Sequence, residues 1–221
     1  MSLNASKSKN HPVSNIKPME AGTYPARLVM VVDLGLQPQR PYQGKEKQPA
    51  YEILTTYEFL DEFLPDENGK DDTSKPRWIS ENFVLHSIDS ERARSTKRYI
   101  SLDPDMVHGG DWSALVGTPC LVTIIKSPGK NGRIYNNIAN VVAMRPKDAA
   151  KAAPLVNPSL VFDLEDASVE GFKTLPEWVQ KKIVSGLEFK GSKLSHLIGG
   201  MPEEPQEEDD GADELDDEIP F

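Results

Sequence analysis

Short runs in which apolar and polar residues alternate constrain this chain more than any other feature of its sequence. In residues 51–60 (YEILTTYEFL), Tyr51 and Tyr57 fall on one face of an extended chain, and Glu52 and Glu58 fall on the other. A period of two, with many β-branched and aromatic residues, is typical of a β-strand that has one face buried. The sequence therefore predicts a β-rich fold.

Other segments of the chain also have the length and composition of strands. These five runs are residues 23–36, 78–86, 97–101, 118–126 and 133–144. Polar segments at 37–49 and 61–76 are expected to form loops, and residues 129–132 (GKNG) carry the Asn-Gly signature of a β-hairpin. Two short helical turns are expected before the run at 118–126, the second at 112–116. About five strands with a short helix before the last hairpin are typical of an OB-fold, although another small barrel would fit the same periodicity.

We therefore expect a mainly β protein built on an OB-type five-stranded barrel with a short internal helix, an added C-terminal helical segment and a disordered acidic tail. Four parts are expected along the chain: a flexible N-terminal arm at 1–20, the barrel at 21–147, a linker and amphipathic helix at 148–200, and the tail at 201–221. The arm is polar and without periodicity, and the tail is low-complexity acid, so neither can form a core of its own.

The helix in the third part is predicted from its first turn and its apolar face. Thr174 and Glu177 have the Thr-x-x-Glu spacing of a capping box, which would place the start of a helix here. Five apolar residues share one face of that helix: Leu175, Trp178, Val179, Ile183 and Leu187. We expect this face to pack on the barrel; contact with a partner or with a second copy is the alternative.

The negative charge of the chain is confined to one end. The net charge is −10, but residues 202–221 contain eleven of the 35 acids and no Lys or Arg. The first 201 residues therefore carry 25 basic and 24 acidic side chains, a balance that permits nucleic-acid binding without predicting it.

Several classes of function find no support in the residues. Cys120 is the only cysteine and the four histidines are widely separated, so neither a disulfide nor a Cys/His zinc site is expected. No catalytic triad, phosphate-binding Gly-rich loop or metal motif occurs, and we expect a protein without enzymatic activity, cofactor or metal. Residues 1–10 lack the apolar region of a signal peptide, and no apolar run approaches the roughly 18 residues of a membrane span. We therefore expect a cytoplasmic protein that does not contact membranes.

Three groups combine basic residues with a tyrosine, which is what single-stranded DNA binding needs: cations for the phosphates and aromatic faces for the bases. In an OB barrel they would lie near the ligand-binding loops and strands. The candidate DNA-binding residues are Arg40, Tyr42, Lys45 and Lys47 in one loop; Arg92, Arg94, Lys97, Arg98 and Tyr99 in a charged segment; Lys126, Lys130, Arg133 and Tyr135 at the hairpin; and Tyr51, Tyr57 and Trp78 on strands. Each basic group could instead be an ordinary solvated surface, and the strand aromatics could belong to the core.

The final six residues combine acids with exposed apolar groups. They are Asp216, Asp217, Glu218, Ile219, Pro220 and Phe221. An acidic run normally keeps a tail solvated, and there is no solvation reason for it to end on Ile, Pro and Phe. The two larger apolar side chains can enter a pocket of a partner, basic groups there can hold the terminal carboxylate, and the acids can steer the tail to a basic surface.

These six residues resemble the C-terminal tip of bacterial single-stranded-DNA-binding proteins, which recruits replication, repair and recombination enzymes. A second resemblance spans about residues 20–190 and is to a phage family of single-stranded-DNA-binding or recombination-associated proteins. Four segments carry it: 22–37 (GTYPARLVMVVDLGLQ), 115–121 (LVGTPCL), 132–138 (GRIYNNI) and 175–183 (LPEWVQKKI). The motifs in these four segments are structural rather than catalytic. Residues before the acidic tail do not resemble the bacterial family whose C-terminal tip this chain shares.

Together these features predict a phage-encoded protein that acts in the cytoplasm of a bacterial host. It would coat single-stranded DNA without sequence preference during replication or recombination and recruit replication, recombination or repair proteins through its tip. An adaptor that binds host proteins without binding DNA, and a mediator that anneals strands, are the alternatives; the chain could also form a homo-oligomer.

Overall fold

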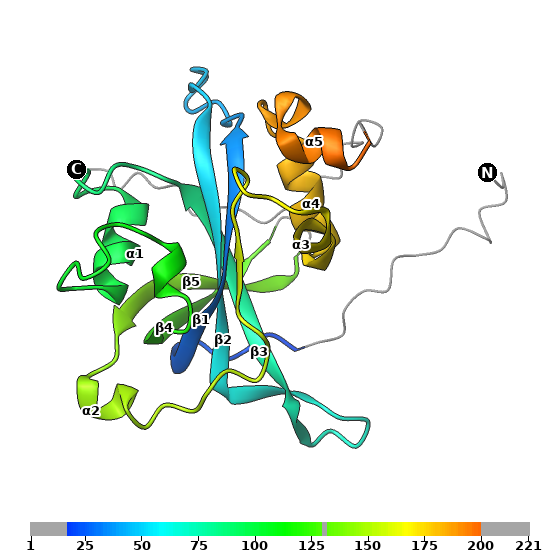
Figure 1. The fold of residues 1–221 in the computed structure, drawn as a ribbon. Helices are drawn as coiled ribbons and strands as arrows, with labels where there is room; N and C mark the ends of the chain where they lie inside the picture. The colour runs from blue at the N-terminus through cyan, green and yellow to red at the C-terminus, as the bar shows by residue number, and fades with distance from the viewer. Residues whose placement is uncertain (1–16, 130–131, 200–221) are drawn as a thin grey trace, which may run out of the picture.

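The computed structural model describes residues 17–129 and 132–199, and these form a mainly β fold (Figure 1). One sheet of six strands contains β1 (Gly22–Gln37), β2 (Ala50–Pro65), β3 (Asp71–Val84), β4 (Pro119–Pro128), β5 (Ile134–Ala143) and β6 (Leu160–Phe162). The first five are hydrogen-bonded in the order β3-β2-β1-β4-β5, each pair antiparallel. β6 lies parallel to β1.

The helices are short and fall into two groups along the chain. Between β3 and β4 lie α1 (Arg94–Leu102) and the 3-10 helix η2 (Ser113–Leu115). After β5 come α2 (Pro146–Ala149), α3 (Val169–Thr174), α4 (Glu177–Val184), η3 (Phe189–Gly191) and α5 (Lys193–Leu197). In the described part of the chain, no helix has the length and apolar character that crossing a membrane requires.

Two apolar cores lie on opposite faces of β1. Ala26 and Leu28 belong to the first core, with residues from β2 to β5 and α1, whereas Val32 and Leu34 belong to the second, with β6 and the C-terminal helices. A register shift between Leu28 and Met30 changes which side chains face each core. A strand covered on both faces needs no polar side, and the run in β1 is accordingly continuous rather than alternating.

The sheet is open and contains six strands, so the expected OB-type barrel of five strands is not confirmed. β3 and β5 end the hydrogen-bonded path, and among the described residues no strand pairing joins them. Side chains bridge the space instead. Arg98 of α1 donates to the Glu81 carboxylate of β3 (2.9 Å) and to the Ala139 carbonyl of β5 (3.4 Å). A second bridge runs through residues 17–19, since the Lys17 carbonyl accepts from Arg77 of β3 and Met19 exchanges two hydrogen bonds with Asn136 of β5.

Two strand-and-loop predictions were wrong. Residues 97–101, expected as a strand, lie within α1, where Ser95, Arg98, Tyr99 and Leu102 are buried at helical spacing. The expected loop at 61–76 is instead mostly the continuation of β2 and β3 toward a tight turn. These strand ends are polar because they extend beyond both cores into solvent.

The predicted capping box was also wrong. Thr174 ends α3, its hydroxyl donates to the Gly171 carbonyl (2.7 Å), and α4 begins at Glu177 without a side-chain cap. The expected apolar face is buried only in part: Leu175, Val179 and Ile183 belong to the second core, whereas two residues, Trp178 and Leu187, are half-exposed.

Candidate nucleic-acid interface

The loop between β1 and β2, residues 38–49, carries the first basic group and projects beyond the sheet at the top of Figure 1. Tyr42 and Lys45 exchange backbone hydrogen bonds (both 2.9 Å) around Gln43 and Gly44, whose φ angles are 48° and 77°. Positive φ at both central residues is the requirement of the tight hairpin turn that joins twisted strands. Lys47 Nζ lies 4.8 Å from the centre of the Tyr42 ring. The loop therefore forms a small ordered hairpin with Arg40, Lys45 and Lys47 exposed.

The root of this loop is tied to the C-terminal helices through a buried carboxylate, Glu52. It accepts from Gln39 of the loop (2.8 Å) and Asn82 of β3 (3.1 Å), and Lys182 of α4 lies 2.7 Å away. Burial alone would raise the pKa of Glu52, but Lys182 and the two amide donors lower it below its ordinary value.

The second basic group lies on and before α1, and the structure divides it. Arg92 and Lys97 are exposed, and Arg94 is half-buried. Arg98 and Tyr99 are buried: Arg98 forms the ion pair with Glu81, and the Tyr99 hydroxyl accepts from the Gly110 amide (2.9 Å). Neither of these two side chains is presented at the surface.

The third group lies at the β4–β5 hairpin. Lys126 forms a 2.6 Å ion pair with Glu20, which lowers the pKa of that carboxyl. Arg133 is exposed and Tyr135 is half-buried. Lys130 lies outside the described residues.

The strand aromatics have different environments. Tyr57 is fully buried in the first core, whereas Trp78, in the middle of β3, is 53% exposed. Tyr51 is half-exposed at the start of β2, and its hydroxyl donates to the Glu188 carboxylate (3.0 Å), which raises the pKa of Tyr51. Of the candidate residues on strands, Trp78 and Tyr51 are those that present an aromatic surface to solvent.

A segment after α2 covers part of the outer face of β1 and β2. Arg27 of β1 donates to the carbonyls of Ala152 and Ala153, and Glu58 of β2 accepts from the backbone amides of Val156 and Asn157. Arg27, Glu58 and Trp78 lie opposite one another on β1, β2 and β3. Because the covering segment occupies the first two positions of this row, the outer face of the sheet is exposed at the third, Trp78.

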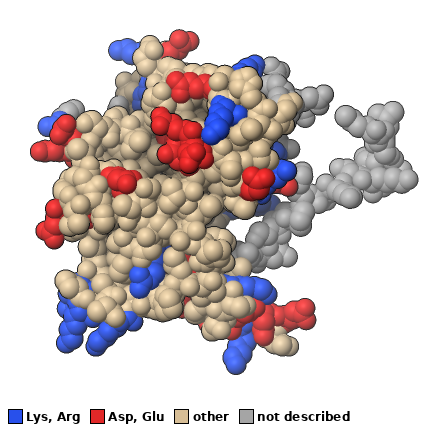
Figure 2. Space-filling view, in the orientation of Figure 1, with Lys and Arg blue, Asp and Glu red and all other residues tan. Residues whose placement is uncertain are grey.

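The candidate groups do not form one continuous basic surface in the described structure. In Figure 1 the β1–β2 loop lies above the sheet and α1 lies to its left. Figure 2 shows Asp and Glu gathered at the upper centre of this face and Lys and Arg mainly along its lower edge. Sequence reasoning missed the half-exposed Trp178, since a helical pattern alone does not show that α4 is too short to bury its whole apolar face.

Two predictions cannot be located in the structure. The tip residues 216–221 and most of the N-terminal arm lie outside the described residues. Within the described ranges, no group of three or more His, Cys, Asp or Glu side chains is arranged to hold a metal ion. A comparison with models of protein families finds no match, and a comparison with curated proteins finds no similar chain.

Proposed function

We propose that this chain binds single-stranded DNA without sequence preference and recruits replication, recombination or repair proteins through residues 216–221. Binding is the whole activity in this proposal, with no catalysis and no cofactor. The chain would be phage-encoded and would act in the cytoplasm of a bacterial host. The sequence resemblances to phage and bacterial single-stranded-DNA-binding proteins support this assignment.

The observation that carries the proposal is the half-exposed indole of Trp78 on the outer face of β3. OB-folds bind oligonucleotides on the face of strands 2 and 3 and through the loops between strands 1 and 2 and between strands 4 and 5. The order β3-β2-β1-β4-β5, with α1 between β3 and β4, is the order along an OB barrel opened between strands 3 and 5. We therefore propose an OB-type fold in which side-chain bridges stand where strands 3 and 5 would pair.

In this arrangement a base stacks on Trp78, and phosphates meet exposed cations of the three basic groups. Those cations are Arg40, Lys45, Lys47, Arg92, Lys97 and Arg133. Base–aromatic stacking contributes roughly 1–3 kcal/mol per base by alanine substitution, which is enough to make one well-placed indole measurable.

The test is a titration of fluorescein-labelled oligo-dT with the protein, in which fluorescence anisotropy reports binding. The oligonucleotide is about 20 nucleotides long, which exceeds the roughly 4–16 nucleotides that one OB-fold covers. We expect Trp78→Ala to weaken binding about tenfold or more. Trp178→Ala is the matched control, because that indole is exposed to nearly the same extent (50% against 53%) on a helix outside the proposed path; it should leave the affinity unchanged.

Other outcomes would select another function. Equal affinity for duplex and single strands would contradict the proposal. No binding at low salt, with or without residues 202–221, would favour the adaptor that acts through its tip alone. Pairing of complementary strands by the protein would favour the annealing mediator, and cleavage of labelled DNA with a divalent metal would indicate a nuclease.

A further inference from the structure

A cavity of about 300 Å³ opens where the end of β1 meets the C-terminal helices. Its apolar walls come from Leu34 and Leu36 of β1, Leu164 after β6, Ile183 of α4 and Phe189 of η3. The Leu187 amide donates to the Leu36 carbonyl (2.8 Å), which fixes the two sides of the cavity against each other. The cavity is at the small end of the range for ligand sites, which suits one long side chain better than a cofactor.

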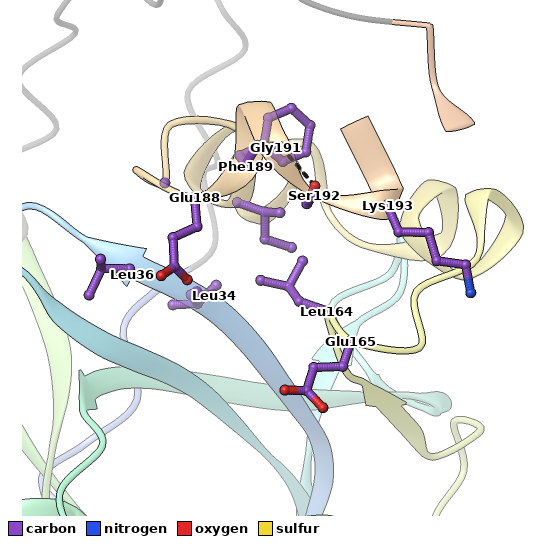
Figure 3. A pocket seen from close by; sticks show the side chains of 12 residues that line it. Leu34, Leu36, Leu164, Glu165, Glu188, Phe189, Gly191, Ser192 and Lys193 are labelled. Atoms are coloured by element: carbon purple, nitrogen blue, oxygen red, sulfur yellow. Dashed lines mark hydrogen bonds between the residues drawn. The ribbon is translucent and has the colours of Figure 1, made fainter. Parts of the chain in front are cut away.

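Two carboxylates stand at the rim of this cavity. Figure 3 shows the Glu188 carboxylate beside Leu34 and Leu36 and the Glu165 carboxylate on the far side of Leu164. Lys193 also lines the cavity, but its side chain extends away from both carboxylates. The Lys193 ammonium lies 4.0 Å from Asp166, a residue that does not line the cavity.

The surroundings of the cavity are also acidic. Burial, together with the nearby carboxylates of Asp163 and Glu165, raises the pKa of Asp33, the β1 residue next to Leu34. Figure 2 shows acidic side chains gathered in the part of the face where Figure 1 places the end of β1 and the C-terminal helices. An apolar cavity under this negative potential favours a ligand that combines an aliphatic stem with a positive charge.

We propose that this cavity binds an arginine side chain presented by a partner protein. The aliphatic stem would contact Leu34, Leu164 and Phe189, and the planar guanidinium can donate two parallel hydrogen bonds to a rim carboxylate, which the ammonium of lysine cannot do. The site is separate from Trp78, so the proposal does not depend on DNA binding.

The test uses the full chain labelled with ¹⁵N and two small probes at constant ionic strength. The probes are N-acetyl-arginine methylamide and N-acetyl-citrulline methylamide, which match in shape and differ in the charge of the head group. We expect the arginine probe to shift the amide signals of Leu36, Leu164 and Phe189 saturably, with a Kd on the order of 1 mM. The citrulline probe should bind about tenfold more weakly or not at all.

Variants of the two rim residues assign the binding to this cavity. Glu165→Gln combined with Glu188→Gln should weaken the arginine probe about tenfold; a glutamine at 188 can still accept from Tyr51, so the wall is kept. Glu170→Gln, an exposed glutamate on α3, is the control and should bind as the unmodified chain does. Thermal unfolding of each variant checks that the fold is retained.

Three results would overturn the proposal. Equal shifts with citrulline would remove the role of charge, and unchanged binding by the double glutamine variant would place the site elsewhere. Concentration-dependent self-association that the double variant abolishes would assign the cavity to a second copy of this chain rather than to a separate partner. Variants at Trp78 that lose DNA binding affect none of these results, because the cavity is separate from Trp78.

Discussion

Arg98 of α1 reaches both strands at which the hydrogen-bonded path of the sheet ends. It pairs with Glu81 of β3, and both side chains are only 8% exposed. Water therefore cannot replace either charged partner. Its other guanidinium contacts are Asn140 Oδ1 and the Ala139 carbonyl of β5. A basic residue in a charged segment is here a structural bridge, because the carboxylate and carbonyl acceptors come from strands far away in the sequence.

We therefore expect Arg98→Met to lower the free energy of unfolding by about 3–5 kcal/mol, since it leaves the Glu81 carboxylate buried without its cation. Urea denaturation measures the change. Combining Arg98→Met with Glu81→Leu should recover much of the loss, because an apolar pair removes both buried charges. The control is Lys97→Met at the exposed neighbouring position, where a change within about 0.5 kcal/mol is expected. A loss of the same size at both positions would contradict the bridge.

At the scale of elements, Glu52 joins the β1–β2 loop, β3 and α4 through Gln39, Asn82 and Lys182. The Gln37 amide group, which donates to the Lys182 carbonyl (3.1 Å), adds a second connection between the end of β1 and α4. The conformation of the loop root is therefore set jointly by the sheet and by the helices that follow it.

This junction predicts an acid-sensitive contribution to stability. The pKa of Glu52 is lower in the folded chain than its ordinary value of 4.5, so the ionised form stabilises the fold above that value. The contribution is lost as the pH falls below 4.5 and through the folded-state pKa. Glu52→Gln should therefore be less stable near neutral pH and should lose less further stability between pH 4.5 and lower pH, as urea denaturation across this range would show. Glu170→Gln should follow the unmodified chain, and parallel curves for both variants would argue against this role.

At the scale of the whole molecule, the charge is separated along the chain. Eleven acids lie in residues 202–221, and the preceding 201 residues are close to neutral. Under the proposed function, this acidic segment competes with DNA for the exposed cations of the body, and added salt screens this competition.

Deleting residues 202–221 should therefore tighten oligo-dT binding several-fold at about 50 mM salt, and much less at about 300 mM, where the Debye length is shorter. Anisotropy titrations at the two salt concentrations measure the effect. Phe221→Ala keeps all eleven acids and is the control: it should leave DNA affinity unchanged and weaken recruitment of the tip's partner proteins. Equal affinities of the deleted and full chains at low salt would remove the competition while leaving tip docking intact.

Much of the strand content was predictable from local pattern. The run at 23–36 corresponds to β1, and the alternation at 51–60 corresponds to most of β2. Cys120 of β4 is buried in the first core, as its apolar neighbours suggest. The helix α1 was not predictable in this way, because its buried face includes Ser95 and Arg98, which are polar. For the candidate site, the sequence predicted which basic and aromatic residues could take part, but not which of their side chains are exposed.

The sequence by itself determined where strands can form, how the charge is divided between body and tail, and which tyrosines, tryptophans and cations could meet DNA. Only the tertiary structure decided that Tyr57 is buried while Trp78 is half-exposed, that Arg98 joins β3 to β5, and that residues 152–157 cover part of the sheet. Alternation and composition report on neighbours within a few residues. Burial depends on which distant segment lies over a face, and that is a property of the assembled fold.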